Sequence, residues 1–149
     1  RGIRRADQEG CLAYLAYMDT LNAPRQVAPE EGVFLEYAPI RRSVKHPIDD
    51  PDCPENVAER APLERLLEVF GRKNAKVLDY WTDNSLFSKW KYPPKPFALD
   101  AEVMQKDVAF YRSLGFSSIT AFGCFLGKDY TDLYGAADLS AYGKILTGA

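Results

Sequence analysis

Two carboxylates and one aromatic residue occupy equivalent positions in three similar apolar segments of this chain. Glu36 follows Val-Phe-Leu, Asp79 follows Lys-Val-Leu, Phe122 follows Ser-Ile-Thr-Ala, and the three positions are equally spaced. A tyrosine comes directly after each carboxylate, at Tyr37 and Tyr80. A repeated strand-plus-helix unit is the simplest cause of this spacing.

A pair of carboxylates at the ends of neighbouring strands could perform glycoside hydrolysis. That reaction generally needs one protonated carboxyl group as acid and one ionised group as base or nucleophile. An apolar setting raises one carboxyl pKa, and a nearby Arg41 or Arg42 would lower the other. We therefore predict that Glu36 and Asp79 are catalytic and lie at the same rim of the sheet. The alternative is that Asp79 is structural and bonded to backbone or to an arginine.

Aromatic side chains near the same segments are candidates for sugar binding. Flat aromatic rings pack against the apolar faces of pyranoses, while nearby polar groups bind the hydroxyls. We predict substrate contacts from Tyr37, Tyr80, Trp81 and Trp90, with Tyr92 close by. Trp90 lies among lysines and prolines, so we expect it to be more exposed than Trp81. The alternative is that these rings fill the core.

The segment from Arg41 to Asn56 is too rich in proline to be regular structure. Long loops in a compact domain often bind or catalyse. Here Arg41 and Arg42 could clamp the carboxylate of an acidic sugar, or they could pair with aspartates of the loop. His46 either contacts a substrate hydroxyl or bonds the loop backbone. One histidine and a few loop aspartates form no metal-ligand pattern, so we predict no metal and no cofactor.

The alternation of helix-like and strand-like segments along the chain predicts parallel βα units in a single α/β domain covering residues 1–149. We expect a first helix at Glu9–Leu21 and three parallel, neighbouring strands with helices outside them. The expected strands are Val33–Ala38, Lys76–Trp81 and Ser118–Phe122, and the expected later helices follow Pro62, Asp100 and Asp138. Turns from helix to strand are tight and loops from strand to helix are long, which places a ligand site beyond the carboxyl ends of the strands.

Three strands cannot close a barrel, and a complete eightfold barrel usually takes about 250 residues. The helix-first order therefore suggests part of a larger (βα)8 barrel, with a small open three-layer sheet as the alternative. Such a sheet leaves an edge open, so we expect either a homo-oligomer or the remainder of a longer barrel protein. The chain begins with Arg1 rather than Met, which suggests a processed chain or an excised piece.

Composition excludes several classes of partner. The net charge is −2, and lysines and arginines are scattered among the acids, so we expect no nucleic acid partner. No apolar run approaches the roughly 20 residues that cross a bilayer, and the first ten residues lack the core of a signal peptide. The three cysteines show no CxxC spacing, which indicates neither a disulfide framework nor a zinc site.

One motif carries a resemblance to a known family. Arg42, His46, Asp50, Cys53 and Asn56 follow the order Arg-x3-His-x3-Asp-x2-Cys-x2-Asn. The segments VLDYWTDN and FYRSLGFSSITAFGCF follow it. With these segments, the part from about position 14 to 127 resembles an uncharacterised domain family of glycoside-hydrolase-like TIM-barrel proteins, which are similar to α-glucuronidases.

The resemblance implies the carboxy-terminal half of a (βα)8-type barrel that acts on or binds a carbohydrate. It further implies an acidic, uronate-containing polysaccharide and a periplasmic or secreted polysaccharide-degrading system. No catalytic residue is implied by the resemblance. Two functions therefore stay open: a glycoside hydrolase that uses Glu36 and Asp79, and a non-catalytic carbohydrate-binding or assembly module of the same architecture.

Overall fold

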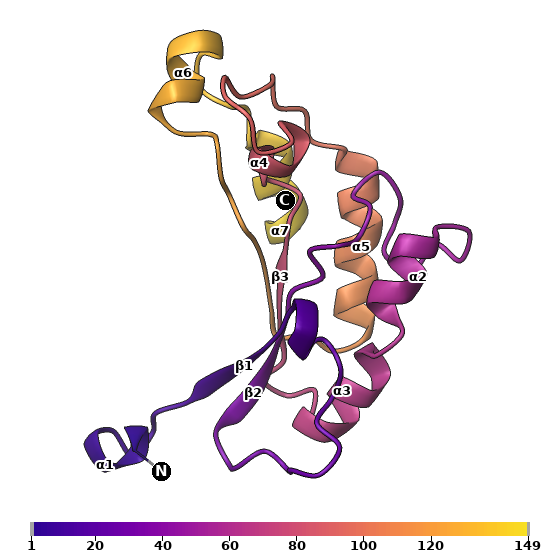
Figure 1. The fold of residues 1–149 in the computed structure, drawn as a ribbon, viewed down its shortest axis with the longest axis vertical. Helices are drawn as coiled ribbons and strands as arrows, with labels where there is room; N and C mark the ends of the chain where they lie inside the picture. Colours follow the sequence, from indigo (N-terminus) through magenta and orange to yellow (C-terminus); the bar gives the residue numbers. More distant parts are fainter. Residues whose placement is uncertain (1, 149) are drawn as a thin grey trace.

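A four-stranded, all-parallel sheet with strand order β1-β2-β3-β4 forms the centre of the fold (Figure 1). This computed structural model describes residues 2–148 of the chain. The strands are β1 (Leu12–Ala16), β2 (Val33–Tyr37), β3 (Lys76–Asp79) and β4 (Ser118–Ala121). Neighbours in the sheet are thus also neighbours in sequence, as expected for successive right-handed crossovers.

The helices that matter for packing lie on one face of this sheet. Figure 1 shows α2, α3 and α5 on the same side of the strands. These and the other helices are α1 (Ile3–Ala6), η1 (Met18–Thr20), α2 (Pro54–Arg60), α3 (Leu63–Phe70), α4 (Asn84–Phe87), α5 (Ala101–Ser113), α6 (Lys128–Tyr134) and α7 (Ser140–Thr147). Helix α7 packs beside α5, and its apolar side reaches the core. No helix in residues 2–148 is long and apolar enough to span a membrane.

The two faces of the sheet differ in burial because side chains alternate along each strand. Leu35, Tyr37 and Val77 face the helices and are fully buried. They form the core with apolar side chains of α3 and α5, among them Leu66 and Tyr111. The other face is not covered by any helix in the part of the chain that the structure describes, and its side chains stay half-buried or exposed.

The prediction of three parallel neighbouring strands with helices outside them is confirmed. Strands β2, β3 and β4 are parallel neighbours at the predicted segments. The helix expected after Asp100 is α5, and the Asp100 carboxylate caps it by accepting a hydrogen bond from the Val103 amide at 3.1 Å. Gly115 ends the α5 segment with φ of +85°, a conformation that glycine adopts without a steric penalty.

The prediction of a first helix at Glu9–Leu21 is wrong, because this segment contains strand β1. Its apolar residues fit a helical period, but pairing with β2 determines the structure here. Tyr14 turns toward the helices and stacks on Phe70 of α3 at 4.5 Å between ring centroids, while Leu15 points to the other face. Residues 2–148 therefore contain four strands rather than the three expected.

Five short helices in residues 2–148 were not predicted, among them α1 and η1 near the amino terminus. Helix α2 begins at Pro54, inside the segment expected to be irregular, and proline suits the first helical position. Helix α4 has a single turn after β3. Helix α6 lies in the connection expected between β4 and the last helix. Each is short, and short helices give little periodic signal in a sequence.

The core packing predicts the effect of a truncation on α3. Leu66 is fully buried, so Leu66→Ala should lower the free energy of unfolding by about 2–5 kcal/mol through lost burial and a residual cavity. Leu133 on α6 is 54% exposed and serves as the matched control, for which Leu133→Ala should cost well under about 1 kcal/mol. Urea denaturation measures both. Equal losses for the two variants would contradict the assignment of the core.

Candidate functional site at the carboxyl end of the sheet

The two predicted catalytic carboxylates do not lie side by side. Glu36 is the register partner of Lys76, whereas Asp79 is the register partner of Ala121. The two positions are therefore offset along the strands, and their side chains leave the sheet on opposite faces. Asp79 is fully buried on the helix side, whereas Glu36 is half-buried on the uncovered side. The expected placement of the pair at one rim is wrong, because equal spacing in sequence does not fix strand register.

Asp79 instead belongs to a buried charge network centred on Arg42. The Arg42 Nη1 lies 2.8 Å from the Asp79 Oδ2 and 2.7 Å from the Asp107 Oδ2, with all three side chains fully buried. Two aromatic donors complete the network. The Tyr111 hydroxyl donates to the Asp79 Oδ2 at 2.7 Å, and the Trp81 indole Nε1 donates to the Asp107 Oδ2 at 2.8 Å.

The electrostatics of this network favour a charged arginine. Burial alone would lower the pKa of Arg42, but the charges of Asp79 and Asp107 raise it by more. Burial raises the pKa of Asp107, and the Arg42 guanidinium opposes that rise. Two carboxylates thus share one guanidinium in a region without solvent, which is a costly arrangement unless hydrogen bonds complete it. We interpret the network as structural, which was the alternative considered for Asp79.

The network holds the long connection between β2 and α2 against the sheet. The Arg42 Nη2 donates to the His46 carbonyl oxygen at 2.9 Å, and the Ile48 amide donates to the Asp107 Oδ1 at 2.6 Å. Asp50, four residues after His46, lies 3.0 Å from the imidazole Nδ1. The pKa of the Asp50 carboxyl is lowered, mostly by a hydrogen bond from the Asp52 amide and next by the hydrogen bond with the His46 imidazole.

Asn56, in the first turn of α2, holds the β2–α2 connection in place through hydrogen bonds. This fully buried side chain accepts a hydrogen bond from the Ser43 amide at 2.7 Å. Its amide nitrogen lies within hydrogen-bonding distance of the carbonyl oxygens of Ser43, His46 and Pro47, at 3.1, 2.9 and 2.8 Å. The motif residues Arg42 and Asn56 therefore shape the loop rather than face solvent.

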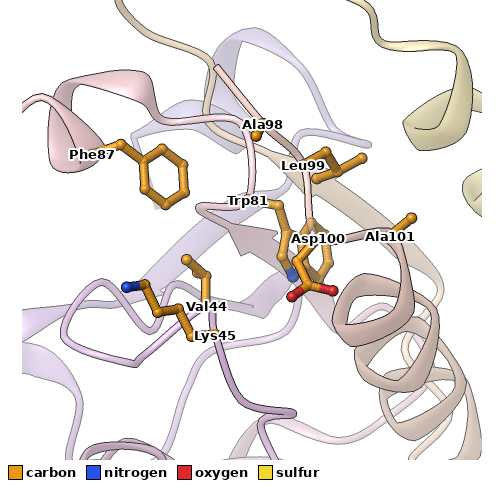
Figure 2. Close-up of a pocket in the computed structure, with 8 residues that line it drawn as sticks. All are labelled: Val44, Lys45, Trp81, Phe87, Ala98, Leu99, Asp100 and Ala101. Atoms are coloured by element: carbon orange, nitrogen blue, oxygen red, sulfur yellow. The ribbon is translucent and has the colours of Figure 1, made fainter. Parts of the chain in front are cut away.

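A pocket of about 570 Å³ opens beside this loop, at the carboxyl end of β3 (Figure 2). Val44 and Lys45 from the β2–α2 connection form one wall, and residues 98–101, where α5 begins, form another. Trp81 lies at the back, and the Phe87 ring from α4 lies on the side near Lys45. The pocket is thus lined by the Lys45 ammonium group, the Asp100 carboxylate and the aromatic ring of Phe87.

Further exposed aromatic side chains lie on the segment that links α4 to α5. Trp90 is 63% exposed and Tyr92 is 62% exposed, which confirms the prediction that Trp90 is more exposed than Trp81. Trp90 has φ of +58°, an unusual value for a bulky residue that requires support from the surroundings. Its amide donates to the Ser85 carbonyl at 2.8 Å, and Tyr92 packs on Phe125 with ring centroids 4.4 Å apart.

The other predicted contact residues are divided between core and surface. Tyr37 is fully buried and donates its hydroxyl to the Glu59 carbonyl oxygen at 2.9 Å, so its prediction as a sugar contact is wrong. The predicted Arg42 clamp is wrong for the same reason, since its guanidinium is inside the network. Tyr80 is almost completely buried beside Phe122, and burial raises the pKa of its hydroxyl. Arg41 and His46 are exposed.

Sequence reasoning missed Asp107, although a signal for it exists. Asp107 falls on the apolar, buried side of α5, with Met104, Val108 and Tyr111. A carboxylate on an otherwise apolar helix face needs a buried partner. Arg41 and Arg42 were the arginines expected near the strand ends. Pairing of Asp107 with one of them could therefore have been predicted.

Comparison with known proteins returned no matching family model, curated protein or solved structure. Within residues 2–148, no group of three or more histidine, cysteine, aspartate or glutamate side chains is arranged to hold a metal ion.

We predict that the hydrogen bonds of the buried Asn56 side chain stabilise the β2–α2 connection. Asn56→Ala leaves several loop carbonyl groups without their donor and should lower the free energy of unfolding by about 1–3 kcal/mol. Amide hydrogen exchange in residues 43–48 should accelerate, while exchange in β3 is unchanged. Asn74 is exposed and provides the matched Asn→Ala control, with little effect on either measurement. Unchanged exchange in the loop would refute the anchoring role.

Proposed function

We propose that this chain is a carbohydrate-binding α/β domain similar to glycoside-hydrolase barrels, with a sugar site in the pocket beside Phe87. One observation carries the proposal: the Phe87 ring lines the same pocket as the Lys45 ammonium group and the Asp100 carboxylate, with the almost completely buried Trp81 at its back. Sugars present apolar ring faces and hydroxyl groups together, so they need both kinds of surface in one pocket. Lys45 would donate a hydrogen bond to a sugar oxygen, and Asp100 would accept one from a hydroxyl.

Exposed aromatic residues on the same connection extend the proposed site. Trp90 and Tyr92 follow Phe87 in the segment between α4 and α5, and both present most of their surface to solvent. A group of large exposed apolar side chains, unlike a single one, often marks a binding surface. We propose that they contact further units of a polysaccharide bound in the pocket.

We also propose that the sheet is the carboxy-terminal half of a (βα)8-type barrel. The consecutive strand order, the parallel pairing and the helices on one face all support this arrangement. The functional residues then lie at the carboxyl ends of the strands, where barrel enzymes place their sites. The choice of half, an acidic polysaccharide as ligand and a location outside the cytoplasm rest on the family resemblance.

Of the two functional classes, binding without hydrolysis has the better support. Glu36 and Asp79 leave the sheet on opposite faces, and Arg42 holds Asp79 in the core. A hydrolase of this architecture would need a different pair of carboxylates, about 5–10 Å apart in one cleft. We therefore propose the non-catalytic carbohydrate module, with the hydrolase class as the alternative that turnover would favour.

A sugar titration tests the proposal. We expect neutral and uronate-containing hexasaccharides to change tryptophan fluorescence in a saturable way. Phe87→Ala should weaken binding about tenfold, because one aromatic–sugar contact contributes about 1–1.5 kcal/mol. Phe122→Ala, which removes a 45% exposed ring outside the pocket, should leave the affinity unchanged.

Two results would count against this function. The absence of any saturable signal with the whole panel would exclude the sugar site, and equal affinity for Phe87→Ala and the unsubstituted chain would exclude this pocket. Turnover of aryl glycosides would favour the hydrolase instead.

A further inference from the structure

The turn between β3 and α4 contains a buried carboxylate without a counter-charge. The Asp83 side chain is 1% exposed, and within residues 2–148 it forms no ion pair with a lysine, arginine or histidine. Its Oδ1 accepts hydrogen bonds from the Ser85 amide at 3.0 Å and from the Ser85 hydroxyl at 2.5 Å. Its Oδ2 is buried and has no hydrogen-bond partner in the same part of the chain. Asp83 therefore lacks the counter-charge that Arg42 gives to Asp79.

The next residue places a second unpaired acceptor in the same turn. Asn84 is fully buried, and its Oδ1 accepts no hydrogen bond from the residues that the structure describes. Its side-chain nitrogen donates to the carbonyl oxygens of Lys95 and Phe125, at 2.9 and 3.4 Å. Both of these neighbours are acceptors, so they fix which end of the Asn84 amide carries the oxygen. Two consecutive residues thus leave one buried oxygen each without a donor.

These two oxygens need a positive charge or a donor that the neighbouring side chains do not supply. A buried polar group without a partner is destabilising, and a buried charge without a counter-charge is more so. Carboxylate, amide and peptide carbonyl oxygens are the ligands that hard metal cations prefer. A carbonyl oxygen that already accepts one hydrogen bond keeps a second lone pair for such an ion. The carbonyl oxygens of Lys95 and Phe125, which Asn84 contacts, are of this kind.

We propose that this turn binds one monovalent metal cation, Na⁺ or K⁺, through the Asp83 Oδ2 and the Asn84 Oδ1. The charge of the site determines the valence, because one carboxylate and several neutral oxygens balance one positive charge. The ligands lie outside the loop around His46, for which we predicted no metal. They contain one acidic side chain rather than a group of three, and the other oxygens come from an amide and from the backbone. The proposal does not depend on the sugar pocket.

A cation in this turn would join three connections at the carboxyl end of the sheet. The Asn84 side chain bonds to the α4–α5 segment at Lys95, and its backbone amide donates to the Cys124 carbonyl in the β4–α6 connection at 3.1 Å. The α4–α5 segment also carries the exposed Trp90, whose amide donates to the Ser85 carbonyl beside the proposed site. Binding of the cation should therefore order the segment that contains Trp90.

Thermal unfolding in different chloride salts tests the proposal. At equal ionic strength, which keeps general screening constant, NaCl or KCl should raise the Tm in a saturable way relative to tetramethylammonium chloride. A cation concentration a hundred times its Kd should raise the Tm by roughly 5–10 °C. Amide hydrogen exchange in residues 90–96 should slow over the same range of cation concentration.

Asp83→Asn separates the cation site from the fold. Asparagine keeps an oxygen that can accept from the Ser85 amide and cap α4, but it removes the charge. The variant should lose the response to Na⁺ and K⁺. In tetramethylammonium chloride it should be at least as stable as the unsubstituted chain, because it buries no charge. Asp129→Asn, on the exposed surface of α6, is the matched control and should keep the full response.

Three results would overturn this inference. The same Tm in all salts would mean that water or a proton on Asp83 satisfies these oxygens without a cation. An equal response of Asp83→Asn and the unsubstituted chain would place the cation elsewhere. Stabilisation by Ca²⁺ alone would contradict the charge argument. None of these results bears on sugar binding, which Phe87→Ala tests separately.

Discussion

The buried guanidinium of Arg42 is the interaction on which the carboxyl end of the sheet depends. It lies between Asp79 at the end of β3 and Asp107 on α5, so one side chain joins a strand, a helix and the loop that carries it. Removing the guanidinium would leave two buried carboxylates without a counter-charge, which is far more costly than the net gain from the complete set. This asymmetry keeps the three elements in one arrangement.

The same arrangement gives the proposed sugar pocket its shape. Lys45 and Val44 come three and two residues after Arg42, and they form a wall of the pocket only because the loop is tied down on both sides of them. Trp81 has a double role, since its indole N–H completes the charge network while its ring lies behind the pocket. A structural network without access to ligand thus determines where the ligand-facing groups stand.

Sequence patterns predicted the elements whose burial is local and missed those that depend on pairing. Strands β2 and β3 are short apolar runs between polar segments, and Asp100 is a clear helix cap, so these were predictable. Strand β1 was not, because its apolar residues also fit a helical period. The alternative in which an arginine holds Asp79 in a structural role matches the observed Arg42–Asp79 pair. The pairing of Glu36 with Asp79 failed, because register depends on loops whose geometry has no simple sequence signal.

The most direct test of this account is a double-mutant cycle between Arg42 and Asp79. The free energy of unfolding is measured for Arg42→Met, Asp79→Asn and the double variant, which replaces the ion pair by groups of similar size. Arg42→Met should cost about 3–5 kcal/mol, because it leaves two buried carboxylates unpaired, whereas Asp79→Asn should cost less, because Arg42 keeps Asp107 as its partner. The double variant should recover part of the Arg42→Met loss, giving a coupling of roughly 1–3 kcal/mol. Additive losses, with a coupling near zero, would contradict the claim that the Arg42 network organises this end of the sheet.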